Sequence, residues 1–131
     1  MSAAHGSALG LSALFLAAGI AHLRNPAPFV AITPEWVPYA RAVILVTGAL
    51  EIAGGIALLT ARMRKAAGIG LALYALCVWP ANVKHAFGGI DLDALPSSWW
   101  YHGPRLALQP LIIWAALFAG TVTDWPFRRR G

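Results

Sequence analysis

Residues 42–61 read AVILVTGALEIAGGIALLTA, and Glu51 is the one charged side chain in this run. A helix of about 20 apolar residues is long enough to cross the hydrocarbon core of a bilayer, which is about 30 Å thick. Glu51 lies near the middle of the run, where inserting an acidic residue costs about 2.5 to 3.5 kcal/mol. The run therefore predicts a membrane-spanning helix, and Glu51 predicts a compensating partner or a function.

The composition of the whole chain supports a membrane class. The chain has 131 residues, of which 59% are hydrophobic and 11% are charged, whereas soluble domains carry about 25% charged residues. Because backbone that faces lipid must satisfy its own hydrogen bonds, apolar runs of this length are expected to be helices. We expect an all-α integral membrane four-helix bundle, a single domain over residues 1–131, with spans at about 6–23, 38–61, 66–87 and 103–122.

The net charge of +5 is carried at the ends of the apolar runs. This pattern sets orientation in membrane proteins, so it argues against a nucleic-acid partner. Six cations fall on the side of the two termini, and four on the other side. The first group is Arg62, Arg64, Lys65 and residues 128–130, and the second is Arg24, Arg41, Lys84 and Arg105. The excess predicts a multi-pass protein of the cytoplasmic (inner) membrane with both termini in the cytoplasm.

Two connections on the outer side have unusual compositions. Residues 25–37 are apolar and rich in proline, which favours an interfacial or re-entrant segment with one helical turn over 27–32. Residues 88–102 carry Asp91 and Asp93 and contain Trp99, Trp100 and Tyr101 near their end. Tryptophan and tyrosine are enriched at membrane interfaces, so these three residues predict an aromatic belt.

Polar side chains gather in the outer half of the predicted bundle. They are His22, Arg41, Glu51, Asn82, Lys84, His85, Arg105 and Gln109. Ionisable residues within spans usually face the bundle interior and pair with one another. We therefore expect Glu51 to pair with Arg105, or else with Arg41 or Lys84. A purely structural cluster, a small-molecule pocket and a proton or ion pathway all remain open.

Small residues flank Glu51 one helical turn to either side, at Gly48 and Gly55. In lipid, such small residues let helices approach one another closely. We therefore expect this face of the second span to pack against a neighbouring helix.

Histidine and cysteine give no signature of a metal or thiol site. His22 and His85 fall near the same outer face, but neither a CxxCH nor an HExxH motif is present, so we expect no metal ligands and no haem. His5 and His102 are expected to face solvent. Cys77 is the single cysteine, which excludes an intrachain disulfide.

Five short stretches occur in an order that resembles the DoxX-like family of small four-span membrane proteins. They are AGIAH at 18–22 with Pro26 and Phe29 after it, ITP at 32–34, TGALEIAGG at 47–55, WPAN at 79–82 and RLALQ at 105–109. The resemblance covers residues 10–114 and implies a four-helix membrane bundle. It also implies an association with redox systems, because one relative is a subunit of a thiosulfate–quinone oxidoreductase, while an animal relative resembles an assembly chaperone for a receptor. The family-like positions are His22, Glu51, Asn82, Arg105 and Gln109.

Three functional hypotheses follow. The first is an accessory or redox-associated subunit that binds a small amphipathic molecule, with a quinone as the first candidate, in an outer-half polar pocket. The second is a membrane enzyme that uses Glu51 as general acid or base, with Lys84 or His85 as a second proton-transfer group. The third is an assembly factor in which a Glu51–Arg105 cluster only holds the bundle together. The partners that we expect are the lipid bilayer and either a membrane redox partner or a second copy of the chain.

Overall fold

The computed structural model describes residues 2–88 and 99–127. Within these residues the chain forms five helices and no strand, which confirms the all-α prediction. They are α1 (Ala3–Arg24), α2 (Ala27–Ile32), α3 (Ala40–Leu59), α4 (Arg64–Phe87) and α5 (Trp99–Ala119). Three of them, α1, α3 and α4, are long and apolar enough to cross a membrane.

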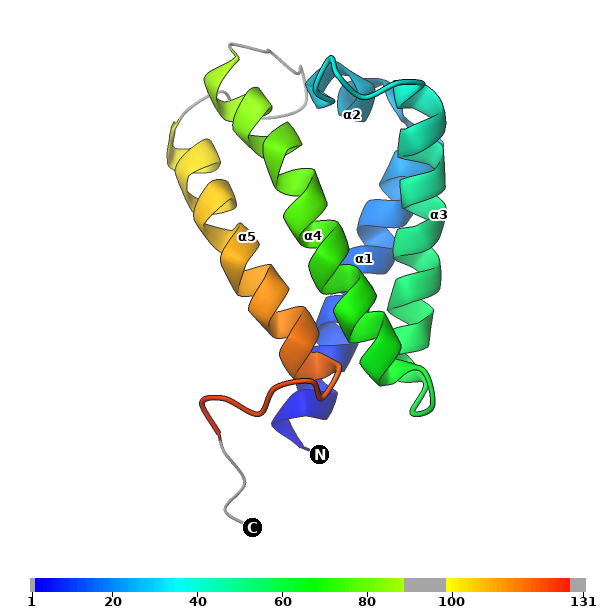
Figure 1. The fold of residues 1–131 in the computed structure, drawn as a ribbon, viewed down its shortest axis with the longest axis vertical. Helices are drawn as coiled ribbons and strands as arrows, with labels where there is room; N and C mark the ends of the chain where they lie inside the picture. Colours follow the sequence, from blue (N-terminus) through cyan, green and yellow to red (C-terminus); the bar gives the residue numbers. More distant parts are fainter. Residues whose placement is uncertain (1, 89–98, 128–131) are drawn as a thin grey trace.

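The four long helices form two antiparallel pairs (Figure 1). α1 packs mainly on α3, and α4 packs mainly on α5. The two pairs converge at the end of the bundle where both termini lie and diverge at the other end, where α2 lies (Figure 1). We call these the termini end and the α2 end.

The elements agree with most of the expected boundaries. The helical turn predicted over 27–32 is α2, which begins directly after Pro26. The last helix begins at Trp99, four residues before the predicted span at 103, so the expected aromatic-belt residues belong to its first turn. Asp91, Asp93 and the arginines at 128–130 lie outside the described residues.

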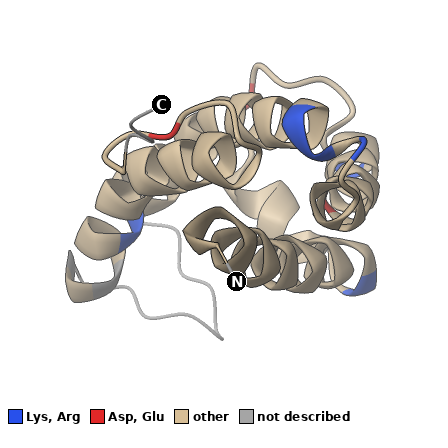
Figure 2. Cartoon of the chain, turned by 90° about the horizontal axis from the view of Figure 1, so that it is seen from below, with Lys and Arg blue, Asp and Glu red and all other residues tan. Residues whose placement is uncertain are grey.

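The hydrophobic core lies toward the termini end and joins all four long helices. It is formed by Ala8, Leu11, Phe15, Leu58, Leu71, Ala72, Ala116 and Ala119. Large apolar side chains such as Leu50, Ile56, Leu73 and Leu111 lie on the outside of the bundle instead. The helical surface carries few charged residues (Figure 2). An extensive apolar exterior of this kind marks a surface that contacts another apolar phase, and it is compatible with a lipid bilayer.

The pairing of α1 with α3 depends on two facing glycines. A Cβ atom at Gly19 would lie 2.6 Å from the backbone oxygen of Gly48, and one at Gly48 would lie 2.8 Å from the Cβ of His22. Two turns further along the pair, the Ser12 hydroxyl donates to the Gly55 carbonyl oxygen at 2.7 Å. The expected close packing around Glu51 is therefore present, and it brings α1 against the face of α3 that carries Glu51.

Substituting Gly19 by alanine tests this contact. Because the Cβ atom would meet backbone rather than a flexible side chain, α1 and α3 must separate, and we expect a loss of about 1 to 3 kcal/mol in unfolding free energy. Gly10→Ala is the matched control, because Gly10 lies on the same helix and a Cβ atom there would meet nothing within 4 Å. Equal thermal stability of the two variants in detergent would contradict the close α1–α3 contact.

Candidate functional site

A cavity of about 320 Å³ lies between the two helix pairs and beneath α2. Most of its wall is apolar, with Phe15, Ile44, Val78 and Ile112 contributing from four different helices. Its polar lining residues are His22, Thr33, Thr47, Glu51, Tyr74, Asn82, Arg105 and Gln109. The predicted outer-half cluster therefore faces, in large part, one shared cavity.

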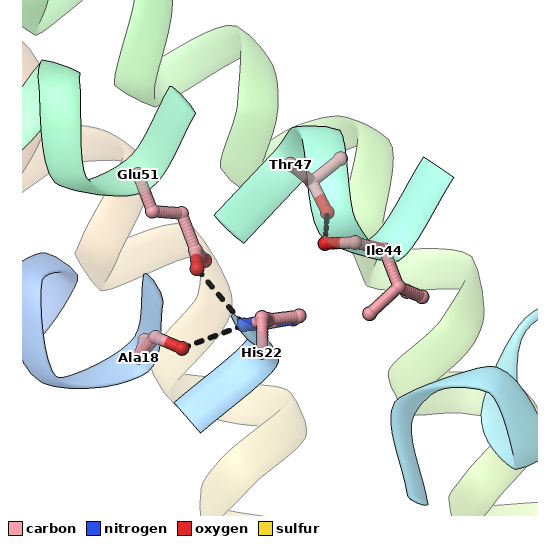
Figure 3. Close-up of polar contacts among 5 residues, drawn as sticks. All are labelled: Ala18, His22, Ile44, Thr47 and Glu51. Carbon is pink, nitrogen blue, oxygen red and sulfur yellow. Dashed lines mark hydrogen bonds and ion pairs between the residues drawn. The ribbon is translucent and has the colours of Figure 1, made fainter. Parts of the chain in front are cut away.

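The wall formed by α1 and α3 contains a buried carboxyl group beside an imidazole. Glu51 is only 4% exposed, and its Oε2 lies 2.9 Å from Nδ1 of His22 (Figure 3). The same Nδ1 lies 2.7 Å from the carbonyl oxygen of Ala18, one turn earlier in α1. Because a carbonyl oxygen can only accept a hydrogen bond, the Nδ1 atom must carry a hydrogen.

The partner of Glu51 is therefore not the arginine that the sequence predicted. Within the described residues Glu51 forms its ion pair with His22, whereas Arg105 donates to Asn82 Oδ1 from the other side of the cavity. The expected Glu51–Arg105 pair is wrong because both residues face the cavity from opposite walls. Depth along each helix predicted that both residues lie in the same half of the bundle, but it did not predict the separation between the helix pairs.

The wall formed by α4 and α5 carries a chain of hydrogen bonds. Arg105 Nη2 donates to Asn82 Oδ1 at 2.6 Å, and Arg105 Nη1 lies 2.6 Å from His85 Nδ1. Asn82 Nδ2 donates to Gln109 Oε1 at 3.3 Å, and Gln109 Nε2 donates to the Ala75 carbonyl oxygen at 2.6 Å. A guanidinium group can only donate, so His85 Nδ1 is the acceptor in its bond. The chain ties α4 to α5 through side chains at the cavity.

α2 closes the α2 end of the cavity and is tied to both helix pairs. The ring of Phe29 stacks on His22, with 3.9 Å between the ring centroids. Lys84 Nζ, on α4, donates to the carbonyl oxygen of Thr33 at 2.7 Å, at the end of α2. Lys84 does not line the cavity, so the structure places it as an anchor for α2 rather than as a group facing a ligand.

Residues 11–119 match the family described as Domain of unknown function (DUF8561). The chain belongs to this family. The matched segment contains every residue that lines the cavity. No curated protein and no solved structure matches the chain.

Five of the eight predicted site residues of this DUF8561 chain line the cavity: His22, Glu51, Asn82, Arg105 and Gln109. Arg41 is exposed on α3 and does not line it. His85 is 2% exposed and sits behind the cavity wall, where its ring lies edge-on to His102 at 4.8 Å between centroids. His102 was expected to face solvent, and it is buried because α5 begins before it.

Among the cavity-lining residues that were not predicted are Thr47, Tyr74 and Phe29. The hydroxyl of Tyr74, on α4, faces the Glu51 carboxyl group and the Thr47 hydroxyl. A sequence signal existed for two of them, because Thr47 precedes Glu51 by four residues and Tyr74 precedes Asn82 by eight, which places each pair on one helix face. Phe29 lies in α2, whose six residues are too few for periodicity to give an orientation.

Replacing Arg105 tests the α4–α5 network. In Arg105→Gln the shorter amide cannot reach both His85 and Asn82, which leaves buried polar atoms without a donor, and we expect a loss of about 1 to 3 kcal/mol in stability. Arg41→Gln is the same change at an exposed position and should alter stability little. Thermal unfolding followed by circular dichroism in detergent measures both, and a similar melting temperature for the two variants would speak against the network.

Proposed function

We propose that this protein is an integral membrane protein that binds a small amphipathic, quinone-like molecule in the cavity between its helix pairs. The cavity itself carries the proposal. Its volume of about 320 Å³ falls at the lower end of the range for small-molecule sites, about 300 to 1,000 Å³. Such sites combine apolar walls with a few convergent polar groups, and that is the composition of this lining.

The proposed placement in the membrane follows from helix length and charge. α5 has 21 residues, about 31 Å at 1.5 Å per residue, so we take it as a fourth span beside α4. Arg62, Arg64 and Lys65 lie in or next to the α3–α4 connection, at the termini end. The positive-inside bias then puts both termini in the cytoplasm and the α2 end on the outer side of the cytoplasmic (inner) membrane.

The choice of a quinone also draws on the likeness to DoxX-like proteins. The stretches that carry this likeness contain His22, Glu51, Asn82, Arg105 and Gln109, and these five residues all line the cavity. We therefore propose that the DUF8561 chain is related to the DoxX-like family and serves as an accessory subunit of a membrane redox system. Its single cysteine, Cys77, gives no dithiol for thiol chemistry within the chain.

Ligand binding can be tested by thermal stability. A ligand that binds only the folded protein stabilises it by about 2.7 kcal/mol at 100 times its Kd, so a short-chain benzoquinone or naphthoquinone should raise the melting temperature in a concentration-dependent way. Val78→Trp fills the cavity and should abolish the shift.

The matched control for that variant is Val83→Trp. Val83 lies on the same helix with an exposed side chain and does not line the cavity, so its quinone-dependent shift should equal that of the wild type. A quinone titration that leaves the wild-type melting temperature and absorption spectrum unchanged would overturn the proposed function.

A further inference from the structure

Contacts between helices close two of the sides of the cavity. On one side, the backbones of α1 and α3 approach each other closely at Gly19 and Gly48. On the opposite side, the side chains of Arg105, Asn82 and Gln109 join α4 to α5. A ligand therefore reaches the cavity through neither of these two sides.

The two ends of the cavity are covered as well. At the α2 end, Ile32 is 6% exposed and lines the cavity, and the Phe29 ring stacks on His22. Toward the termini end, the rings of Phe15 on α1 and Tyr74 on α4 meet edge-on, with 6.3 Å between their centroids. The remaining routes into the cavity lie between α3 and α4 and between α1 and α5.

Two residues on the α3–α4 side line the cavity and are also exposed on the outside of the protein. One is Cys77 on α4. The other is Trp36, which is 75% exposed and lies in the segment that leads from Thr33, bound by Lys84 of α4, to the beginning of α3. Because the same side chains face both the cavity and the surroundings, the cavity opens to the outside between α3 and α4.

Small and apolar side chains border this opening. Val43 of α3 and Ala81 of α4 line the cavity together with Cys77, and we call these three residues the α3–α4 seam. Val46 and Leu73, each 58% exposed, extend the apolar surface on the outside of the same two helices. Cys77 lies ten residues before the last residue of α4, about 15 Å at 1.5 Å per residue. In the proposed membrane placement the seam therefore faces the hydrocarbon core, which is about 30 Å thick.

The α1–α5 side is less suited to an apolar chain. Leu14 on α1 is exposed and lines the cavity there. However, α5 lines the cavity with Arg105, Gln109 and Ile112, of which the first two are polar. A chain that leaves past α5 would cover a guanidinium and an amide group, and covering polar groups with apolar surface is unfavourable.

We propose that the ligand of this cavity is a lipid-soluble molecule with a long apolar tail, whose ring lies in the cavity while the tail leaves through the α3–α4 seam into the bilayer. The volume of about 320 Å³ is at the lower end of the range for small-molecule sites, so it accommodates a ring but not a long chain beside it. The inference rests on the proposed function and specifies its ligand class: a tailed amphiphile that enters from the membrane.

Alkylation of Cys77 tests the inference in the native sequence, because this is the single cysteine of the chain. The probes are two fully substituted benzoquinones that differ in one ring substituent, methyl or decyl, and full substitution prevents them from adding to the thiol. Calorimetric titration gives their Kd values, and intact mass follows alkylation of the full chain by N-ethylmaleimide in detergent. At 10 times its Kd the decyl compound should slow alkylation about 10-fold, because about one protein in eleven then remains unliganded. The methyl compound at the same multiple of its Kd should slow it far less.

The matched control moves the thiol by one residue. Leu76 is 52% exposed on α4 and does not line the cavity. In Leu76→Cys combined with Cys77→Ala, the decyl compound should leave the alkylation rate unchanged. This control separates protection by the bound tail from an effect of the decyl compound on the micelle.

A bulky side chain in the seam gives a second readout. Cys77→Phe should lower the ratio of decyl to methyl affinity by about 10-fold or more, because the tail and the phenyl ring compete for the same space. Leu76→Phe is the same change outside the cavity and should keep the wild-type ratio. Leu14→Phe places the same ring on the α1–α5 side and tests the rival route.

The outcomes separate the inference from the proposed function. If the decyl compound binds but protects Cys77 no better than the methyl compound, or if Cys77→Phe keeps the wild-type ratio, the inference is wrong while the proposed function stands. If Leu14→Phe lowers the ratio and Cys77→Phe does not, the tail leaves between α1 and α5, and the assignment to the α3–α4 seam is wrong. If neither compound binds the wild-type protein, both the inference and the proposed function fail.

Discussion

The contact between Glu51 and His22 is the interaction on which the rest of the site depends. A carboxyl group in the middle of an apolar helix needs a partner from another helix, because lipid cannot solvate it. The partner reaches it only because Gly19 and Gly48 allow the backbones of α1 and α3 to touch. The Ala18 carbonyl oxygen then fixes which ring nitrogen carries the hydrogen. The two glycines, which have no polar side chain, thus determine that His22 meets Glu51 at this wall of the cavity.

The opposite wall satisfies its polar groups in a different way. Arg105 donates to Asn82 on α4 rather than pairing with Glu51, and Gln109 extends the chain of bonds to the Ala75 carbonyl oxygen. Glu51 and Arg105 therefore lie on separate walls with the cavity between them. A directly formed salt bridge would have closed this space, since its partners would have to meet within about 4 Å. Separation of these two side chains leaves the cavity open.

The sequence predicted the level of the site better than its contacts. Counting residues along each apolar run placed His22, Glu51, Asn82, Arg105 and Gln109 in the same half of the bundle, and all five line the cavity. The same counting could not give the rotation of each helix or the order of the helices around the bundle, so it paired Glu51 with Arg105. The contact that Lys84 makes could not be predicted either, because its partner is a backbone carbonyl oxygen, that of Thr33 at the end of α2. His102 was misplaced by a helix boundary, which sequence patterns fix only to within a few residues.

The hydrophobic core joins the two helix pairs at the termini end and leaves them apart at the α2 end (Figure 1). Ala8, Leu58 and Ala116 are completely buried at the termini end, whereas the helix pairs diverge toward α2 (Figure 1). Asn82 lies ten residues beyond the core residue Ala72 on α4, about 15 Å along the axis at 1.5 Å per residue. A tilt of about 5° at the core would therefore move Asn82 by about 1.3 Å, enough to change the width of the cavity while the core contacts stay in place. Two contacts hold α2 across this end: the Phe29 ring stacks on His22, and Lys84 Nζ donates to the Thr33 carbonyl oxygen. Together they limit how far the two helix pairs can separate.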